Sequence, residues 1–280
     1  MSFNRAIQAG GVAVITGAAN GVGLAAAMDL SRRGLDIILA DLPGPNLDAA
    51  IETVSNAVQG NATVTAKPTD VSDAAAVNEL ADMAFSAGPV AVLMNNAGVA
   101  RPTRAWLDAQ DWRRMIEVNL FGVINGVQAF TQRMVDANRP ATIINTGSKQ
   151  GITTPPGNPG YNVTKAGVKV VTEMLAHELR EAGAPISAHL FVPGFTYTGM
   201  IASFLPNKPD AAWTSEQAVD HLFTRVSAGD FYVLCPDNDV TPEIDARRVT
   251  WAAMDIVENR PALSRWHPDF TARFTQFEKG

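Results

Sequence analysis

The sequence has few of the features that several classes of protein require. It contains one cysteine, Cys235, which excludes an internal disulfide and a cysteine zinc cluster, and we expect no metal site. Charged residues are only 18% of the chain and hydrophobic residues are 46%, which argues against disorder and provides enough apolar side chains for a core. No apolar run approaches the roughly 18–20 residues that cross a bilayer, so we expect no membrane partner.

Positive charge is also scarce. The chain has 22 Lys and Arg against 28 Asp and Glu, so its formal net charge is −6. A nucleic-acid-binding domain would carry a basic stripe that faces phosphates, so we expect no nucleic-acid partner. The first residues, MSFNRAIQAGG, lack a long apolar segment, which argues against a secretory signal. The expectation is a soluble cytoplasmic protein.

Short apolar, β-branched runs alternate with longer amphipathic stretches along most of the chain, and this alternation favours a parallel sheet with helices on both sides. The expected strands are residues 12–16, 36–41, 62–67, 90–96, 141–146, 186–192 and 231–235. The expected helices are residues 22–33, 46–59, 74–87, 108–137, 159–182, 215–228 and 242–259.

A glycine-rich turn, TGAANGVG at 16–23, follows the first expected strand and precedes a helix. Its glycine spacing is G-x-x-x-G-x-G, so the usual G-x-G-x-x-G pattern of dinucleotide-binding proteins is not matched literally. Such a turn lets backbone N–H groups approach a pyrophosphate at the positive end of the helix. A tight turn without a ligand is the alternative.

The second expected strand ends in Asp41, 18 residues after Gly23. An acidic residue about 20 residues beyond the glycines can accept hydrogen bonds from adenosine ribose and would repel a 2′-phosphate. No Lys or Arg lies in the glycine turn or within 40–45. This pattern favours NAD over NADP, although an ordinary strand-end or helix-capping Asp is the alternative.

Tyr161 and Lys165 lie four residues apart on an expected helix, so they share a face. A lysine ammonium near a phenol lowers the phenol pKa, and such a tyrosine can exchange a proton with an alcohol or a carbonyl. Taken alone, this spacing also occurs by chance on many surface helices.

Two further polar residues are candidates for the same chemistry. Ser148 follows the strand at 141–146, where its hydroxyl can bond a substrate oxygen. A Ser-His-Asp nucleophile is the rival interpretation, but TGSKQG is not a G-x-S-x-G elbow and no histidine has an obvious partner motif. Asn119 interrupts an apolar helix face and needs hydrogen-bond partners, which a purely structural role would also satisfy.

Together, these residues resemble the short-chain dehydrogenase/reductase family in its short single-domain form. The matching segments span about residues 10–235, in the family's order and spacing: TGAANGVG (16–23), Asp41, DV (70–71), NNAG (95–98), Asn119, Ser148, YNVTK (161–165) and PGFTYTG (193–199). The resemblance implies a Rossmann-like, doubly wound parallel sheet of about seven strands within a single domain, 1–280. Its core would be about 10–235, with a C-terminal helical extension at 236–280. It also implies a homotetramer or homodimer.

The resemblance further implies NAD-dependent hydride transfer between a secondary alcohol and a ketone. Tyr161 would be the general acid/base, Lys165 would lower its pKa, Ser148 would orient the reacting oxygen and Asn119 would support a water-mediated proton path. The implied cofactor-binding residues are Gly17, Asn20, Gly21, Val22, Gly23, Asp41, Leu42, Asp70, Val71, Asn96, Ala97, Gly98, Tyr161, Lys165, Pro193, Gly194, Thr196 and Thr198. The expected substrate-binding residues are Ser148, Gln150 and Tyr161.

The chain departs from the family's pattern at Thr196, where an apolar residue is commoner, and at Lys149-Gln150, where small or apolar residues are commoner. We therefore expect Gln150 to reach the substrate.

The segment 195–214 is rich in large side chains. It either covers an apolar or aromatic alcohol or ketone in the site, or forms a lid that packs on the domain. Its large side chains are Phe195, Tyr197, Met200, Ile201, Phe204, Leu205 and Trp213. Arg101 and Arg104, just after NNAG, either bind an anionic substrate or are solvated or paired on the surface.

Two other functions remain open at this point. One is a lyase, epimerase or dehalogenase activity on the same scaffold, and the other is a non-catalytic NAD-binding protein. The aromatic residues after Cys235 are expected either to cover a neighbouring subunit or to close over the active site.

Overall fold

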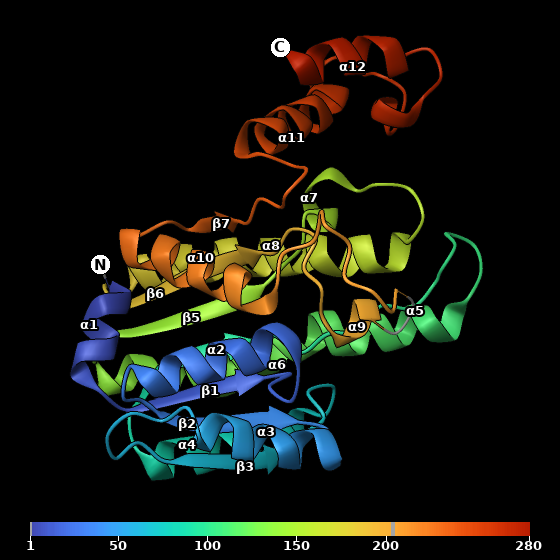
Figure 1. The fold of residues 1–280 in the computed structure, drawn as a ribbon. Helices are drawn as coiled ribbons and strands as arrows, with labels where there is room; N and C mark the ends of the chain where they lie inside the picture. Colours follow the sequence, from blue (N-terminus) through green and yellow to red (C-terminus); the bar gives the residue numbers. More distant parts are fainter. Residues whose placement is uncertain (1, 203–204) are drawn as a thin grey trace.

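The centre of the fold is one parallel sheet of seven strands in the order β3-β2-β1-β4-β5-β6-β7 (Figure 1). The computed structural model describes residues 2–202 and 205–280. The strands are β1 Val12–Thr16, β2 Asp36–Asp41, β3 Val64–Pro68, β4 Val90–Asn95, β5 Ala141–Thr146, β6 Ile186–Val192 and β7 Tyr232–Leu234. The order reverses direction between β1 and β4, as in doubly wound sheets, and the predicted fold class is confirmed.

Two layers of helices bury the two faces of the sheet. Alternate residues of β1 show the division, since Ala13 and Ile15 face one core cluster while Val12 and Val14 face the other. The first layer contains α1 Ser2–Ala9, α2 Gly21–Arg32, α3 Pro45–Ser55 and α10 Ser215–Ala228. The second contains α4 Ala74–Ala87, α6 Gly122–Ala137 and α8 Pro159–Glu181. The short helices α7 Gln150–Thr153 and α9 Gly199–Ala202 follow β5 and β6.

Helix α1 was not expected from the sequence. It carries Phe3, whose fully buried ring stacks on Phe223 of α10 with centroids 5.2 Å apart. Phe3, Ala6 and Ile7 give the segment an amphipathic face, but eight residues are too few for a helix that is stable by itself, so its packing against α10 stabilises it.

The helix expected at 108–137 is divided into three parts. α5 Ala109–Met115 leads into a π-helical turn, η1 Ile116–Phe121, and then into α6. Asn119 lies in the π-helical turn, and such turns are frequent at functional sites. A π turn shifts the helical period by one residue over a single turn, which is too local a change for the hydrophobic pattern to reveal.

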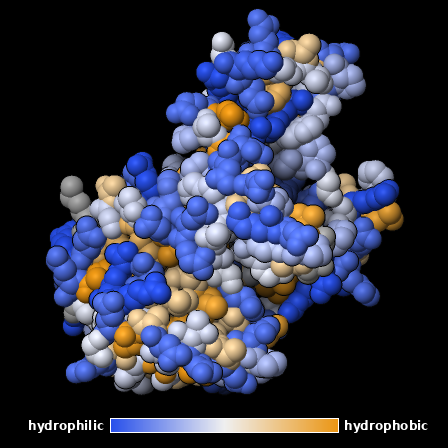
Figure 2. Space-filling model, in the orientation of Figure 1, coloured by the Kyte–Doolittle hydropathy of each residue, from blue (hydrophilic) through white to orange (hydrophobic). Residues whose placement is uncertain are grey.

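The C-terminal extension stands off the sheet (Figure 1). It consists of α11 Pro242–Val257, a 3-10 turn η2 Ser264–Trp266 and α12 Thr271–Lys279. The Trp251 ring lies 5.2 Å from each of the Phe274 and Phe277 rings, so these aromatic residues form a small core within the extension and do not close over the sheet edge. Most of its visible surface is hydrophilic (Figure 2). The boundary between core and extension at 235/236 stays a prediction.

Among the described residues, none of the helices is both apolar enough and long enough to cross a membrane. The cytoplasmic location stays a prediction.

Candidate active site

A cavity of about 930 Å³ opens along the carboxyl edge of the sheet, where doubly wound folds bind ligands. It is lined by the turns that follow β1, β2, β4, β5 and β6 and by the first turn of α8. The predicted site residues that line it are Gly17, Asn20, Gly21, Val22, Asp41, Leu42, Asp70, Val71, Asn96, Ala97, Gly98, Ser148, Gln150, Tyr161, Lys165, Pro193, Gly194, Thr196 and Thr198. Gly23 and Asn119 do not line it.

The glycine turn between β1 and α2 requires glycine for two different reasons. Gly17 and Gly21 have positive φ angles of 65° and 54°, which strain other residues. A Cβ on Gly23 would lie 2.2 Å from the Gly17 carbonyl oxygen, so only glycine at position 23 lets helix α2 pack this closely against the turn. The first N–H groups of α2 have no helical acceptor, and the Asn20 side chain does not cap them. The turn therefore offers N–H donors and the positive helix end to an anion.

Asp41 forms part of the cavity wall at the end of β2. Its Oδ2 accepts a hydrogen bond from the Ala19 N–H at 2.8 Å, and its Oδ1 accepts one from the Leu42 N–H at 2.8 Å. These two bonds fix both carboxylate oxygens, so a negative charge stays beside the glycine turn.

Asp70 faces a cation that sequence reasoning missed. Arg114 of α5 lines the cavity, and its Nη2 lies 3.4 Å from Asp70 Oδ2. Burial opposes ionisation of Asp70, but hydrogen bonds from Ser72 and the charge of Arg114 outweigh it and lower the Asp70 pKa. The local sequence does not indicate that Arg114 belongs to the site, because its partner Asp70 lies 44 positions away in the chain.

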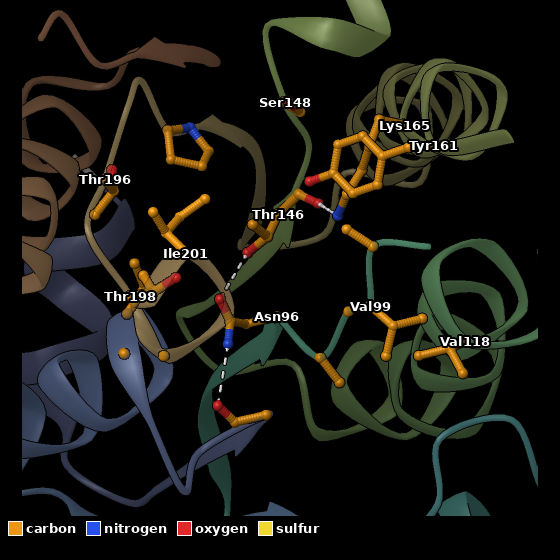
Figure 3. Close-up of a pocket in the computed structure, with 18 of the residues that line it drawn as sticks. Asn96, Val99, Val118, Thr146, Ser148, Tyr161, Lys165, Thr196, Thr198 and Ile201 are labelled. Atoms are coloured by element: carbon orange, nitrogen blue, oxygen red, sulfur yellow. Dashed lines mark hydrogen bonds between the residues drawn. The ribbon is translucent and has the colours of Figure 1, made fainter. Parts of the chain in front are cut away.

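The Asn96 side chain joins the ends of three strands (Figure 3). Its Nδ2 donates to the carbonyl oxygens of Thr16 and Gly17 at 3.0 and 3.3 Å, and its Oδ1 accepts from Thr146 Oγ1 at 3.4 Å. Asn96 therefore holds the glycine turn of β1 against β4 and β5, and its amide atoms are largely used in doing so.

Tyr161, Ser148 and Lys165 come together at the other end of the cavity (Figure 3). Asn158 caps α8 by accepting the Tyr161 N–H at 3.3 Å, which places Tyr161 in the first turn of that helix. The Ser148 hydroxyl lies beside the Tyr161 phenol in the cavity lining, and its Oγ accepts the Gln150 N–H at 3.2 Å. Lys165 Nζ donates to the Thr146 carbonyl oxygen at 2.7 Å and lies 5.7 Å from the Tyr161 ring centroid.

The pKa values at this end differ from the sequence-based expectation that Lys165 lowers the Tyr161 pKa. Tyr161 keeps part of its surface in the cavity, yet burial raises the pKa of its phenol, and the hydrogen bond with Ser148 opposes this only in part. Burial lowers the pKa of Lys165 to about 8. Within the protein alone, desolvation therefore outweighs the attraction between an ammonium and a phenolate.

Asn119 is fully buried behind the cavity wall. Its Oδ1 accepts the Val99 N–H at 2.7 Å and its Nδ2 donates to the Val99 carbonyl oxygen at 2.9 Å. The side chain therefore holds the loop that follows β4, as the structural alternative anticipated. Asn119 lies next to the site, since its Oδ1 is 3.4 Å from where a Cβ on Gly98 would stand, and Lys165 Nζ is 3.8 Å from the same point.

The segment after β6 contributes fewer side chains than expected. Phe195 and Ile201 line the cavity, but Trp213 bonds Asn238 and the Tyr197 hydroxyl bonds the carbonyl oxygens of Leu205 and Pro206. Phe204 and the Met200 side chain lie outside the described residues. At the opposite side, Arg101 lines the cavity and Arg104 does not.

The histidines do not support a Ser-His-Asp nucleophile at Ser148. His189 bonds the Asp230 carbonyl oxygen and Ser187, and His221 bonds the Leu234 carbonyl oxygen. Neither of these residues lines the cavity, and neither do His177 and His267.

Comparisons with known proteins match most of this chain in sequence and in fold. The family model described as short chain dehydrogenase matches residues 11–209. The chain is 32% identical to 1-deoxy-11-beta-hydroxypentalenate dehydrogenase of Streptomyces exfoliatus, over 91% of this chain and 93% of that protein. It superimposes with a TM-score of 0.80 on a short-chain dehydrogenase/reductase from Burkholderia phymatum in complex with NAD, at 33% identity over 90% and 96% of the two chains. A Sphingobium yanoikuyae short-chain dehydrogenase in complex with NADPH shares the fold, with a TM-score of 0.73 at 24% identity over 89% and 94% of the two chains.

Proposed function

We propose that this chain, which belongs to the short-chain dehydrogenase/reductase family, interconverts a secondary alcohol and a ketone with NAD as its cofactor. Membership of the family and the similarity to a named dehydrogenase support oxidoreduction at a CH–OH group as its class of reaction. The observation that carries the finer proposal is one cavity that is lined both by the glycine turn of α2 and by the side chains of Ser148, Tyr161 and Lys165.

The cavity suits a nicotinamide dinucleotide along its whole length. Asp41 and Asp70 would hold the adenosine, the N-terminus of α2 would bind the pyrophosphate, and Lys165 and Thr198 would lie beside the nicotinamide ribose. The fit rests on the unblocked N–H groups of α2 and on the absence of a Cβ at Gly17 and Gly21. When bound, the nicotinamide ring would supply the hydride acceptor for oxidation and the hydride donor for reduction.

The residues of the chain provide orientation and proton transfer. Ser148 Oγ donates a hydrogen bond to the substrate oxygen, and Tyr161 Oη removes the hydroxyl proton in the oxidation direction. Burial keeps the Tyr161 phenol protonated in the protein alone, so oxidation requires the Lys165 ammonium, which the Thr146 carbonyl oxygen holds below the ring, to stabilise the phenolate. In the reduction direction Tyr161 returns the proton to the carbonyl oxygen. Phe195 and Ile201 line the cavity and favour an apolar or aromatic substrate.

A panel of secondary alcohols and ketones tests the proposal, with turnover followed by NADH absorbance and binding by NADH fluorescence. We expect NADH binding and oxidation of at least one apolar or aromatic secondary alcohol. Binding without turnover of any member would favour a non-catalytic NAD-binding protein. Redox-neutral conversion of a substrate would favour a lyase or epimerase, and absence of dinucleotide binding would refute the proposal.

We further propose that the chain is a homodimer or homotetramer. Helix α8 exposes Val163, Val170 and Met174, which are 50%, 54% and 52% accessible, and Phe121 of η1 is 49% accessible. The spacing of the three α8 residues places them on one helix face, and α8 packs against η1. Light scattering after size exclusion should give a multiple of 29.8 kDa for the wild type and a smaller assembly for Val170→Asp. A wild type that is monomeric would contradict the proposal.

A further inference from the structure

Lys149 is directly bonded along the chain to Ser148, and its side chain leaves the cavity toward the C-terminal extension. Its Nζ lies 2.6 Å from Asp245 Oδ2 in the first turn of α11 and 3.7 Å from Asp237 Oδ2 in the turn after β7. The three side chains are only 20%, 9% and 8% exposed. This is a buried ionic cluster rather than a solvated surface pair, so its geometry is tightly constrained.

Asp237 connects this cluster to the second turn at the nicotinamide end of the cavity. Its Oδ2 accepts the Phe195 N–H at 3.2 Å, directly after Pro193-Gly194. Its Oδ1 accepts the N–H groups of Val240 and Asp239 at 2.8 and 3.1 Å, which fixes the carboxylate within its own turn. The turns that carry Ser148 and Gly194 are therefore held to one common carboxylate.

Asp245 connects the same cluster to the extension. Thr241 caps α11 by accepting the Ile244 N–H, and Asp245 follows in that turn, where the helix packs against α7. Burial raises the Asp245 pKa and the bond with Lys149 opposes this, so the carboxylate depends on its lysine partner for its charge. No other carboxylate is within 4 Å of Lys149 Nζ in the part of the chain that the structure describes.

We propose that Lys149 and Asp245 are positioning residues for the reaction, through which the C-terminal extension sets the place of the Ser148 hydroxyl relative to the Gly194–Phe195 turn. The inference rests on the proposed function of Ser148. Catalysis depends steeply on such placement, because a displacement of about 1 Å can lower a rate by about 10²-fold. The extension is then part of the catalytic architecture, although it contributes no side chain to the cavity.

Isosteric substitution tests this role. Asp245→Asn should lower kcat about tenfold and leave the NADH dissociation constant within about twofold, because Asp41 and the glycine turn at the other end of the cavity are untouched. Lys149→Met should act in the same direction, and Lys149→Arg should restore most of the loss, since it keeps the charge. The matched control is Glu278→Gln, which removes the partner of Arg248 (2.6 Å) inside the extension and leaves the Lys149 cluster intact. Glu278→Gln should keep the wild-type kcat.

Hydrogen exchange supplies a readout that does not require a substrate. In Asp245→Asn, peptides covering 147–154 and 193–198 should exchange faster than in Glu278→Gln at equal thermal stability. Unchanged exchange in these peptides would overturn the inference even if no alcohol is ever found. If Asp245→Asn and Glu278→Gln had equal kcat values, the cluster would stabilise the fold without positioning Ser148, and the inference would be wrong. A wild type that oxidises no alcohol would count against the proposed function alone, since the exchange comparison still decides the positioning role.

Discussion

Replacing Tyr161 by phenylalanine is expected to lower kcat for alcohol oxidation by about 10³-fold, the range that a lost general base produces. The substitution removes only the hydroxyl, so the ring still fills the first turn of α8 and NADH affinity should stay within about twofold. Tyr161 lines the cavity together with Ser148 and Lys165, so its hydroxyl is the group placed to exchange a proton with the alcohol. Initial rates with a substrate from the alcohol panel, and fluorescence titration with NADH, measure the two quantities.

Tyr232→Phe is the matched control for this experiment. The Tyr232 hydroxyl lies on β7, bonds Glu173 and does not line the cavity. Its loss should leave kcat within about twofold of the wild type. If Tyr161→Phe kept a tenth or more of the wild-type kcat, Tyr161 would not be the general acid/base.

NADH is expected to bind about 100-fold more tightly than NADPH, because two like charges brought together in a binding site cost several kcal/mol. The Asp41 carboxylate cannot turn away from a 2′-phosphate, since its two oxygens accept the N–H groups of Ala19 and Leu42. The cavity-lining Arg114 already faces Asp70, and Lys165 is bonded to Thr146 at the other end. Fluorescence titration with the two reduced dinucleotides gives the ratio directly.

Asp41→Ser should bring this ratio to within about tenfold, by weakening NADH binding and relieving the repulsion of NADPH. Asp36→Asn is the matched control, because Asp36 begins the same strand and bonds Thr63 at the opposite edge of the sheet. It should leave the ratio unchanged. Equal or tighter binding of NADPH by the wild type would show that Asp41 does not select the cofactor.

The strands and the order of the site residues were predictable because their signals are local. Buried parallel strands appear as short apolar runs, and a residue that follows such a run must lie at the carboxyl edge of the sheet. Asp41, Asn96 and Ser148 were placed correctly at the cavity by this reasoning alone. The family's motifs supplied the remaining candidates, among them Thr196 and Thr198.

The helix at the N-terminus and the division of residues 108–137 were not predictable, because both depend on distant partners. α1 exists where Phe3 meets Phe223, and η1 carries an amide that bonds Val99. Gly23 and the Asn119 side chain belong to the motifs but lie behind the cavity wall, a placement that spacing along the chain does not encode.

The sequence by itself determined the fold class, the edge at which the site lies and the set of groups gathered there, because periodicity and strand ends are properties of contiguous residues. Only the tertiary structure decided the electrostatics of that set, because burial and through-space charge depend on residues far apart in the chain. It raises the Tyr161 pKa where spacing predicts the opposite. It also gives Lys149, which appears in the sequence as an unusual neighbour of Ser148, two carboxylate partners 88 and 96 positions further along the chain.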